Sequence, residues 1–106
     1  MRTIDREELK AKLERGEALK LIMALDRHAY ERMHLPGSLY FDRLSEAAER
    51  LNPDDEIVVY CSNPACHASW DAYHLLRSRG FKRLYRYAGG LEDWSNAGYP
   101  LEGGMA

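Results

Sequence analysis

Short apolar runs alternate along the chain with segments of helical periodicity. The clearest run, Ile57-Val58-Val59-Tyr60, is continuously apolar and β-branched, which predicts a strand buried on both faces as in a parallel sheet. Further strands are predicted at residues 19–25, 38–41 and 84–87. Helical patterns follow Asp5, run through Tyr30 and Met33, and cover residues 44–51, 67–79 and a last segment from Gly89-Gly90 through Trp94. This alternation predicts an α/β fold: a small open, mainly parallel sheet of about five strands with helices on both faces.

Capping residues mark the ends of two predicted helices. Asp5 followed by Glu8 forms a capping box at the start of the first helix, and Gly16 is a suitable residue for its end. Gly80 lies just beyond the helix predicted at 67–79.

Length and charge then narrow the class of protein. A chain of 106 residues is about one domain's worth, so we expect a single domain over 1–106. Fifteen basic and seventeen acidic residues are interleaved and leave a net charge of −2, which disfavours nucleic acid and anionic membranes as partners. The charged start and the lack of long apolar runs indicate a cytoplasmic protein. No motif indicates a nucleotide cofactor, and no feature of the sequence predicts the oligomeric state.

The candidate chemistry lies directly after the buried strand. In open α/β sheets, ligands bind at the carboxyl ends of the strands, and Cys61 occupies that position. Backbone N–H groups of the following turn and the start of the next helix favour a thiolate, the nucleophilic form of cysteine. The alternative is a buried apolar cysteine that only fills space at the strand end.

Five segments in the same order resemble the rhodanese-like domain family. Residues 30–38 (YERMHLPGS) are similar to the family's Tyr-x-x-Gly-His-Ile-Pro-Gly-Ala segment, and residues 57–61 (IVVYC) to the strand that carries its active-site cysteine. Gly80-Phe81 with Leu84-Tyr85, then Gly89-Gly90-Leu91 with Trp94, and finally residues 97–101 (AGYPL) match the closing pattern. The resemblance covers nearly the whole chain and implies the family's fold.

The resemblance also implies sulfur transfer without a cofactor. Cys61 would take a sulfane sulfur from thiosulfate, a persulfide or a polysulfide and pass it to a thiol, including a protein thiol, or to a cyanide-like acceptor. The backbone of the following loop would surround the bound sulfur: Ser62, Asn63, Pro64, Ala65, Cys66 and His67. His34 matches a histidine of the family that fixes its own loop by hydrogen bonds.

Three departures from the family pattern bear on activity. Met23-Ala24-Leu25 replaces the usual Asp-x-Arg, which an apolar core can accommodate. The loop from Cys61 to His67 contains no Arg or Lys, so we expect weak thiosulfate binding and a preference for less charged donors. The loop is also about two residues longer than the common pattern, as in related phosphatases. Their C-x5-R motif requires an arginine where this chain has His67, so phosphatase or arsenate reductase activity is the weaker interpretation.

Cys66 is the second candidate thiol. It can act as a resolving thiol that attacks a Cys61 persulfide or sulfenic acid and leaves a reversible disulfide, or it can pack against the helix start without meeting Cys61. A binding or thiol-redox sensing module that uses both cysteines is therefore the alternative to an enzyme. Cys61, Cys66 and His67 lack the second pair of ligands typical of zinc sites, so no metal is expected.

Overall fold

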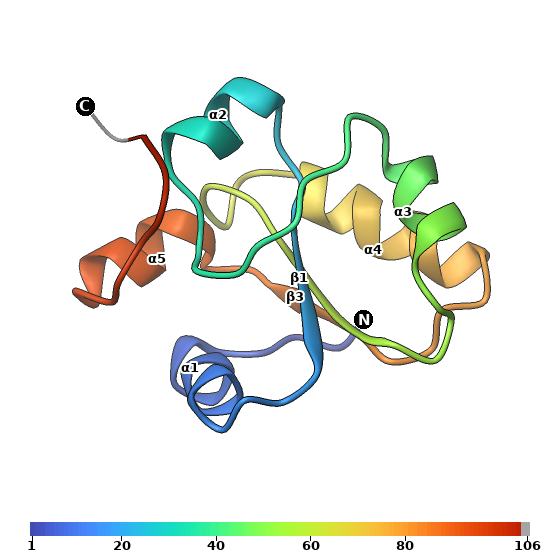
Figure 1. Cartoon of the computed structure of the whole chain (residues 1–106), viewed down its shortest axis with the longest axis horizontal. Coiled ribbons are helices and arrows are strands. Elements are labelled where there is room, and N and C mark those ends of the chain that lie inside the picture. Colours follow the sequence, from blue (N-terminus) through green and yellow to red (C-terminus); the bar gives the residue numbers. More distant parts are fainter. Residues whose placement is uncertain (105–106) are drawn as a thin grey trace.

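A computed structural model describes residues 1–104 of the chain (Figure 1). Helices and strands alternate in the order α1 (Arg6–Glu14), β1 (Leu19–Met23), α2 (Arg27–Arg32), α3 (Leu44–Arg50), β2 (Glu56–Tyr60), α4 (Ala68–Ser78), β3 (Leu84–Tyr87) and α5 (Gly90–Asn96). All of the predicted helices are present, and each end that was predicted lies within two residues of the observed one. The capping box is confirmed, because the Glu8 N–H donates to Asp5 Oδ1 at 2.8 Å.

The three strands form one parallel sheet in the order β1-β2-β3. The central strand β2 is buried at each of its five residues, as its uninterrupted apolar run predicts. Single parallel bridges extend the sheet at both edges, where Thr3 pairs with Arg86 and Leu39 pairs with Ile22. The described sheet therefore has three strands and two edge bridges, where the sequence predicts about five strands.

The segment predicted as a strand at residues 38–41 contributes only its Leu39 bridge. Leu39 exchanges two backbone hydrogen bonds with β1, of 2.7 and 3.1 Å. The residues that follow turn toward α2: Tyr40 stacks on Tyr30, and Asp42 forms an ion pair with Arg27. These side-chain contacts draw the chain away from the sheet after a single bridge.

Helices cover both faces of the sheet, which confirms the predicted layering (Figure 1). Along β2, Val58 and Tyr60 pack into one core cluster, while Ile57 and Val59 pack into the other. The first cluster includes residues of α1 and α5: Leu9, Leu91 and Trp94. The second includes residues of α3 and α4: Ala47, Ala72, Tyr73 and Leu76. The alternation of side chains along a strand thus gives each face its own apolar layer.

Strand β1 ends at Met23, two residues earlier than predicted. The Ala24 N–H still donates to the Tyr60 carbonyl oxygen at 2.8 Å, after which Asp26 caps α2 through the Ala29 N–H. Met23 and Ala24 are buried, and Leu25 packs against the first core cluster. The apolar triple at the family's Asp-x-Arg position is therefore part of the core.

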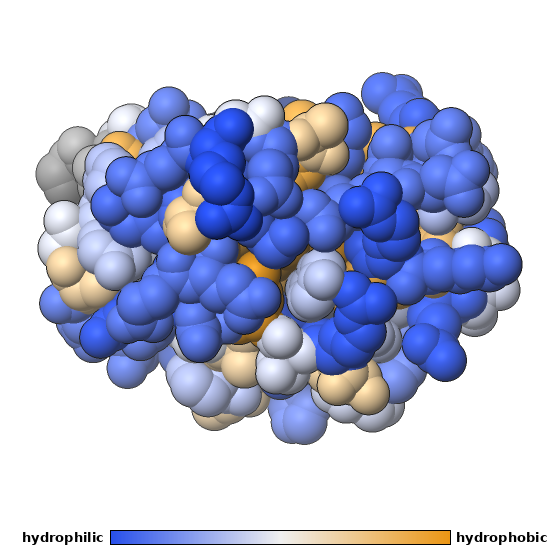
Figure 2. Space-filling model, turned by 90° about the horizontal axis from the view of Figure 1, so that it is seen from below, coloured by the Kyte–Doolittle hydropathy of each residue, from blue (hydrophilic) through white to orange (hydrophobic). Residues whose placement is uncertain are grey.

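The surface is largely hydrophilic. Figure 2 shows one face covered by polar and charged residues, with apolar atoms visible only in narrow gaps and small spots. Among the described residues, the large hydrophobic side chains that are exposed are Met1, Leu39 and Trp70. The longest helix within residues 1–104, α4, has 11 residues, and none of the described helices has the length and hydropathy needed to cross a bilayer.

Candidate active-site loop

Cys61 is the first residue after β2 and lies at the carboxyl edge of the sheet. Its side chain is buried among the core residues, with 1% of the residue exposed. The loop then runs from Ser62 to His67, and α4 begins at Ala68. Ser62, Asn63 and Cys66 are half-buried, whereas Pro64, Ala65 and His67 are exposed. The cysteine therefore sits at the base of a loop whose tip faces solvent.

The start of α5 fixes the first two residues of this loop. The Leu91 N–H donates to the Cys61 carbonyl oxygen at 2.9 Å, and the Glu92 N–H donates to the Ser62 carbonyl oxygen at 2.8 Å. Gly90 has a φ of +65°, and a Cβ at this position would collide with the Cys61 carbonyl. A glycine is therefore required for α5 to approach the loop this closely.

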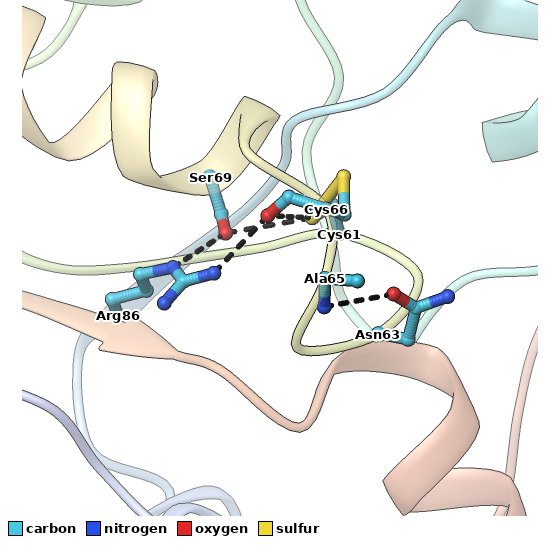
Figure 3. Close-up of a disulfide and its surroundings, with 6 residues drawn as sticks. All are labelled: Cys61, Asn63, Ala65, Cys66, Ser69 and Arg86. Atoms are coloured by element: carbon cyan, nitrogen blue, oxygen red, sulfur yellow. Dashed lines mark hydrogen bonds between the residues drawn. A yellow bond between two sulfur atoms is a disulfide. The ribbon is translucent and has the colours of Figure 1, made fainter.

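Asn63 organises the tip of the loop (Figure 3). Its Oδ1 accepts a hydrogen bond from the Ala65 N–H at 3.0 Å, and its carbonyl oxygen accepts one from the Cys66 N–H at 3.1 Å. Two backbone amides predicted to surround a bound sulfur thus donate to Asn63 in this arrangement, and Pro64 has no N–H to offer.

A disulfide joins Cys61 and Cys66 (Figure 3). Their Cα atoms are 6.5 Å apart, a separation that a disulfide spans without displacement of the backbone. Of the two placements considered for Cys66, the structure has the one in which its sulfur meets that of Cys61. The loop can therefore bring both thiols into direct reaction with each other.

Arg86, on β3, donates hydrogen bonds to two atoms that lie close to Cys61 Sγ. Its Nε donates to Ser69 Oγ at 2.9 Å, and its Nη2 donates to the Cys66 carbonyl oxygen at 3.1 Å. Those two oxygen atoms are themselves close to Cys61 Sγ, at 3.4 and 3.5 Å respectively (Figure 3). The Arg86 guanidinium thus donates directly to both oxygen atoms that lie next to the Cys61 sulfur.

Sequence reasoning missed Arg86 and Ser69 as site residues. The loop sequence contains no Arg or Lys, but the tertiary fold supplies a cation from a strand 20 residues from Cys66. One signal was present in the sequence: Arg86 lies two residues after the buried Leu84, so both point to the α4 side of the sheet. A cation at such an inward position requires a polar partner.

His67 lies apart from this network of contacts. It is the exposed N-cap residue of α4 and makes no side-chain capping hydrogen bond. His67 is therefore a solvated residue at the start of α4. Within residues 1–104, no cluster of three or more His, Cys, Asp or Glu side chains is arranged to hold a metal ion.

Tyr60 and His34 hold the segment that follows α2 against the sheet. The Tyr60 hydroxyl accepts a hydrogen bond from the Leu35 N–H at 3.0 Å and lies 2.6 Å from Ser38 Oγ, and burial raises the pKa of Tyr60 to about 12. His34 Nδ1 is 2.7 Å from the Tyr30 carbonyl oxygen, and its ring stacks on that of Tyr30. These contacts agree with a structural role for His34.

A cavity of about 340 Å³ opens at the carboxyl edge of β1, on the side of the sheet where α4 begins. Its lining is mostly apolar and includes two carboxylates: Met23, Ala24, Leu25, Asp26, Phe41, Asp42, Leu44 and Ala68. Asp42 is already paired with Arg27. This surface suits the apolar part of an organic molecule better than a small dianion.

The sequence profile of the Rhodanese-like domain family matches residues 5–97, so the chain belongs to this family. It is 32% identical over 71 residues to the thiosulfate sulfurtransferase GlpE of Coxiella burnetii (strain RSA 331 / Henzerling II), covering 65% of this chain and 64% of that protein. It is 28% identical over 94 residues to the putative sulfur carrier protein YrkF of Bacillus subtilis (strain 168), covering 87% of this chain and 50% of that protein. The chain thus spans half to two-thirds of the length of these relatives.

Solved structures agree with this assignment. The solution structure of the rhodanese-like domain of the Alr3790 protein from Anabaena superposes with a TM-score of 0.88 at 31% sequence identity, covering 99% of this chain and 81% of that one. The predicted fold class is therefore confirmed.

Proposed function

We propose that this chain acts as one rhodanese-like domain that carries a sulfane sulfur on Cys61. The observation that carries the proposal is the position of Cys61, buried at the carboxyl end of the central strand and followed by a polar loop. With thiosulfate as donor, the Cys61 thiolate attacks the outer sulfur. A new S–S bond forms, the S–S bond of thiosulfate breaks, and sulfite leaves with the electron pair of the broken bond.

The second step returns Cys61 to its starting form. A thiolate acceptor attacks the terminal sulfur of the Cys61 persulfide, so that a persulfide forms on the acceptor and the Cys61 thiolate leaves. Cyanide reacts in the same way and gives thiocyanate. Low-molecular-weight or protein thiols are suitable acceptors, and a cytoplasmic, reducing environment suits the cycle because it keeps such thiols available.

Cys66 provides a second reaction by which the Cys61 persulfide can be consumed. Its thiolate attacks Cys61 Sγ, the Cys61–Cys66 disulfide forms, and the outer sulfur leaves as hydrosulfide; two external thiols then reduce the disulfide. The disulfide in the structure supports this route, because it brings the two sulfurs into bonding contact.

Organic persulfides and polysulfides suit the site better than thiosulfate. The described contacts of Arg86 direct its Nε and Nη2 to Ser69 and to the Cys66 carbonyl. The cavity at the carboxyl edge of β1 presents apolar side chains and the carboxylates of Asp26 and Asp42. A dianion gains little from these groups, whereas an apolar sulfur chain or organic group can be accommodated.

Thiocyanate formation in the presence of cyanide tests the proposal. The reduced protein should form thiocyanate catalytically, and faster from an organic persulfide or organic polysulfide than from thiosulfate. Cys61→Ser should reduce the rate to that of donor and cyanide alone, while Cys66→Ser retains catalysis and releases less hydrosulfide. Equal rates for the parent protein and Cys61→Ser would refute the assignment of Cys61.

A thiol-redox or binding module is the second candidate, and the Cys61–Cys66 disulfide is the observation that favours it. Such a module would form the disulfide with mild peroxide yet give no thiocyanate from either donor. Catalytic turnover that depends on Cys61 would exclude it as the sole function.

A further inference from the structure

We propose that Arg86 is a positioning residue that favours the thiolate of Cys61 by acting through Ser69 and the Cys66 carbonyl. This rests on the proposed role of Cys61 as the reacting thiol. The argument begins with proton placement. Ser69 is buried, with 1% of the residue exposed, and its Oγ accepts the Nε–H of Arg86. A guanidinium group can only donate, so the hydroxyl hydrogen of Ser69 must point elsewhere.

Cys61 Sγ is a partner for that hydrogen. In the disulfide form it lies 3.4 Å from Ser69 Oγ, within range of a hydrogen bond to sulfur, and the same contact is available to the reduced thiolate. A thiolate accepts a hydrogen bond from a hydroxyl more strongly than a neutral thiol does, so this contact stabilises the charged form. Arg86 therefore fixes the direction in which Ser69 donates, and it polarises the hydroxyl group.

The second hydrogen bond of Arg86 reduces the repulsion between the Cys66 carbonyl oxygen and a Cys61 thiolate. The Cys66 carbonyl oxygen lies 3.5 Å from Cys61 Sγ, where its partial negative charge opposes a thiolate. Arg86 Nη2 donates to this oxygen at 3.1 Å and withdraws electron density from it. Both polar atoms next to the sulfur are thus held by one guanidinium, a fork that the single ammonium group of lysine does not reproduce.

The pH dependence of alkylation tests this role without any sulfur donor. A Cys66→Ser background leaves Cys61 as the single thiol of the chain. In that background, Arg86→Met and Ser69→Ala should each move the midpoint of the iodoacetamide rate profile up by about one pH unit, a roughly tenfold lower rate on the rising limb. Arg86→Lys should fall between Arg86→Met and the parent, because it keeps the charge and loses the fork.

Two further comparisons distinguish an effect of Arg86 through Ser69 from the effect of losing any positive charge near the site. If Arg86 acts largely through Ser69, the double variant should shift the midpoint by less than the sum of the two single shifts. Arg83→Met is the matched control, because it removes one guanidinium from the region just before β3, where Arg83 pairs with Glu56. It should leave the midpoint unchanged. The nearby ionisable residues His67, Glu92 and Asp26 are common to all these proteins, so differences between them report the substituted residues.

The outcomes are distinct. An unchanged midpoint in both Arg86→Met and Ser69→Ala, or a fully additive double variant, would overturn the proposal. If Arg86→Met does not fold, Arg86→Lys and Ser69→Ala still give the comparison, and an unchanged midpoint in both would also overturn it. A shifted midpoint in a protein that fails to form thiocyanate would leave the positioning role intact and remove the proposed sulfur transfer instead.

Discussion

The carboxyl ends of β1 and β2 lie side by side in the sheet, yet they are built from different interactions. At the end of β1, Met23 and Ala24 are buried and Leu25 packs on the core. At the end of β2, Cys61 is equally buried, but it is surrounded by directional contacts from Ser69, the Cys66 carbonyl and α5. Apolar packing thus forms the first strand end, whereas hydrogen bonds fix the geometry of the second.

This difference explains how the chain tolerates the loss of the family's Asp-x-Arg. A buried ion pair can be replaced by well-packed apolar residues at little cost in stability. Reactive groups are not replaceable in that way, because a nucleophile needs a defined electrostatic environment. Substitutions at the end of β1 should therefore change stability, and substitutions around Cys61 should change chemistry or the geometry that supports it.

Gly90→Ala should have the largest effect on stability. Its Cβ would collide with the Cys61 carbonyl at a φ of +65°, so we expect the free energy of unfolding to fall by about 3 kcal/mol or more. Gly16→Ala is the control: its φ is +69°, but nothing lies within 4 Å of the added methyl group, and it should cost about 1 kcal/mol. Chemical denaturation compares the two, and equal losses would show that α5 does not constrain the loop through Gly90.

Met23→Ala should separate stability from chemistry. Truncation of this fully buried side chain should cost about 3 kcal/mol in denaturant unfolding. Persulfide formation from thiosulfate per folded molecule should stay within about twofold of the parent, because Met23 lies outside the hydrogen-bond network of Cys61 and thiosulfate does not need the apolar cavity that Met23 lines. Met33→Ala, at a half-buried position, should lose less stability. A folded Met23→Ala protein that cannot take up sulfur would contradict the distinction between the two strand ends.

Tyr60, the last residue of β2, should make stability fall above pH 10. Burial raises its pKa to about 12 in the folded state, so the fold favours the protonated phenol. The stabilisation is complete below the unfolded pKa of about 10 and is lost as the pH rises through 12, at most about 2 to 3 kcal/mol. Urea unfolding of Tyr60→Phe should show lower stability at neutral pH but a shallower decline between pH 10 and 12. Parallel declines would contradict the buried-phenol account.

Asn63→Ala should have the smallest effect. It removes the Oδ1 that accepts the Ala65 N–H at 3.0 Å, at an exposed loop tip where one such bond contributes about 1 kcal/mol. Asn63→Asp keeps the acceptor and should be close to the parent in thermal unfolding. A loss as large as that of Gly90→Ala would mean that the loop tip, and not α5, holds the loop in place.

The sequence predicted the parts of this architecture that depend on local patterns. The continuous apolar run of β2 defined the central strand, and Cys61 followed as its first residue. The single bridges that Leu39 and Thr3 form at the sheet edges were harder to predict, because so short a pairing depends on tertiary contacts of the neighbouring side chains. The Arg86 contacts to Ser69 and Cys66 were missed, since they join β3 to α4 and to the loop after β2 and depend on tertiary packing. The meeting of Cys61 with Cys66 likewise depends on the loop conformation, which Asn63 and α5 set.

The most direct test of the central claim is the intact mass of the reduced protein after incubation with polysulfide. We predict a gain of one sulfur atom in the parent and in Cys66→Ser, located on the peptide that contains Cys61 and removed by cyanide. Cys61→Ser should gain none. Uptake of cyanide-labile sulfur by Cys61→Ser, or no uptake by Cys66→Ser, would contradict the role of Cys61 as the sulfur carrier.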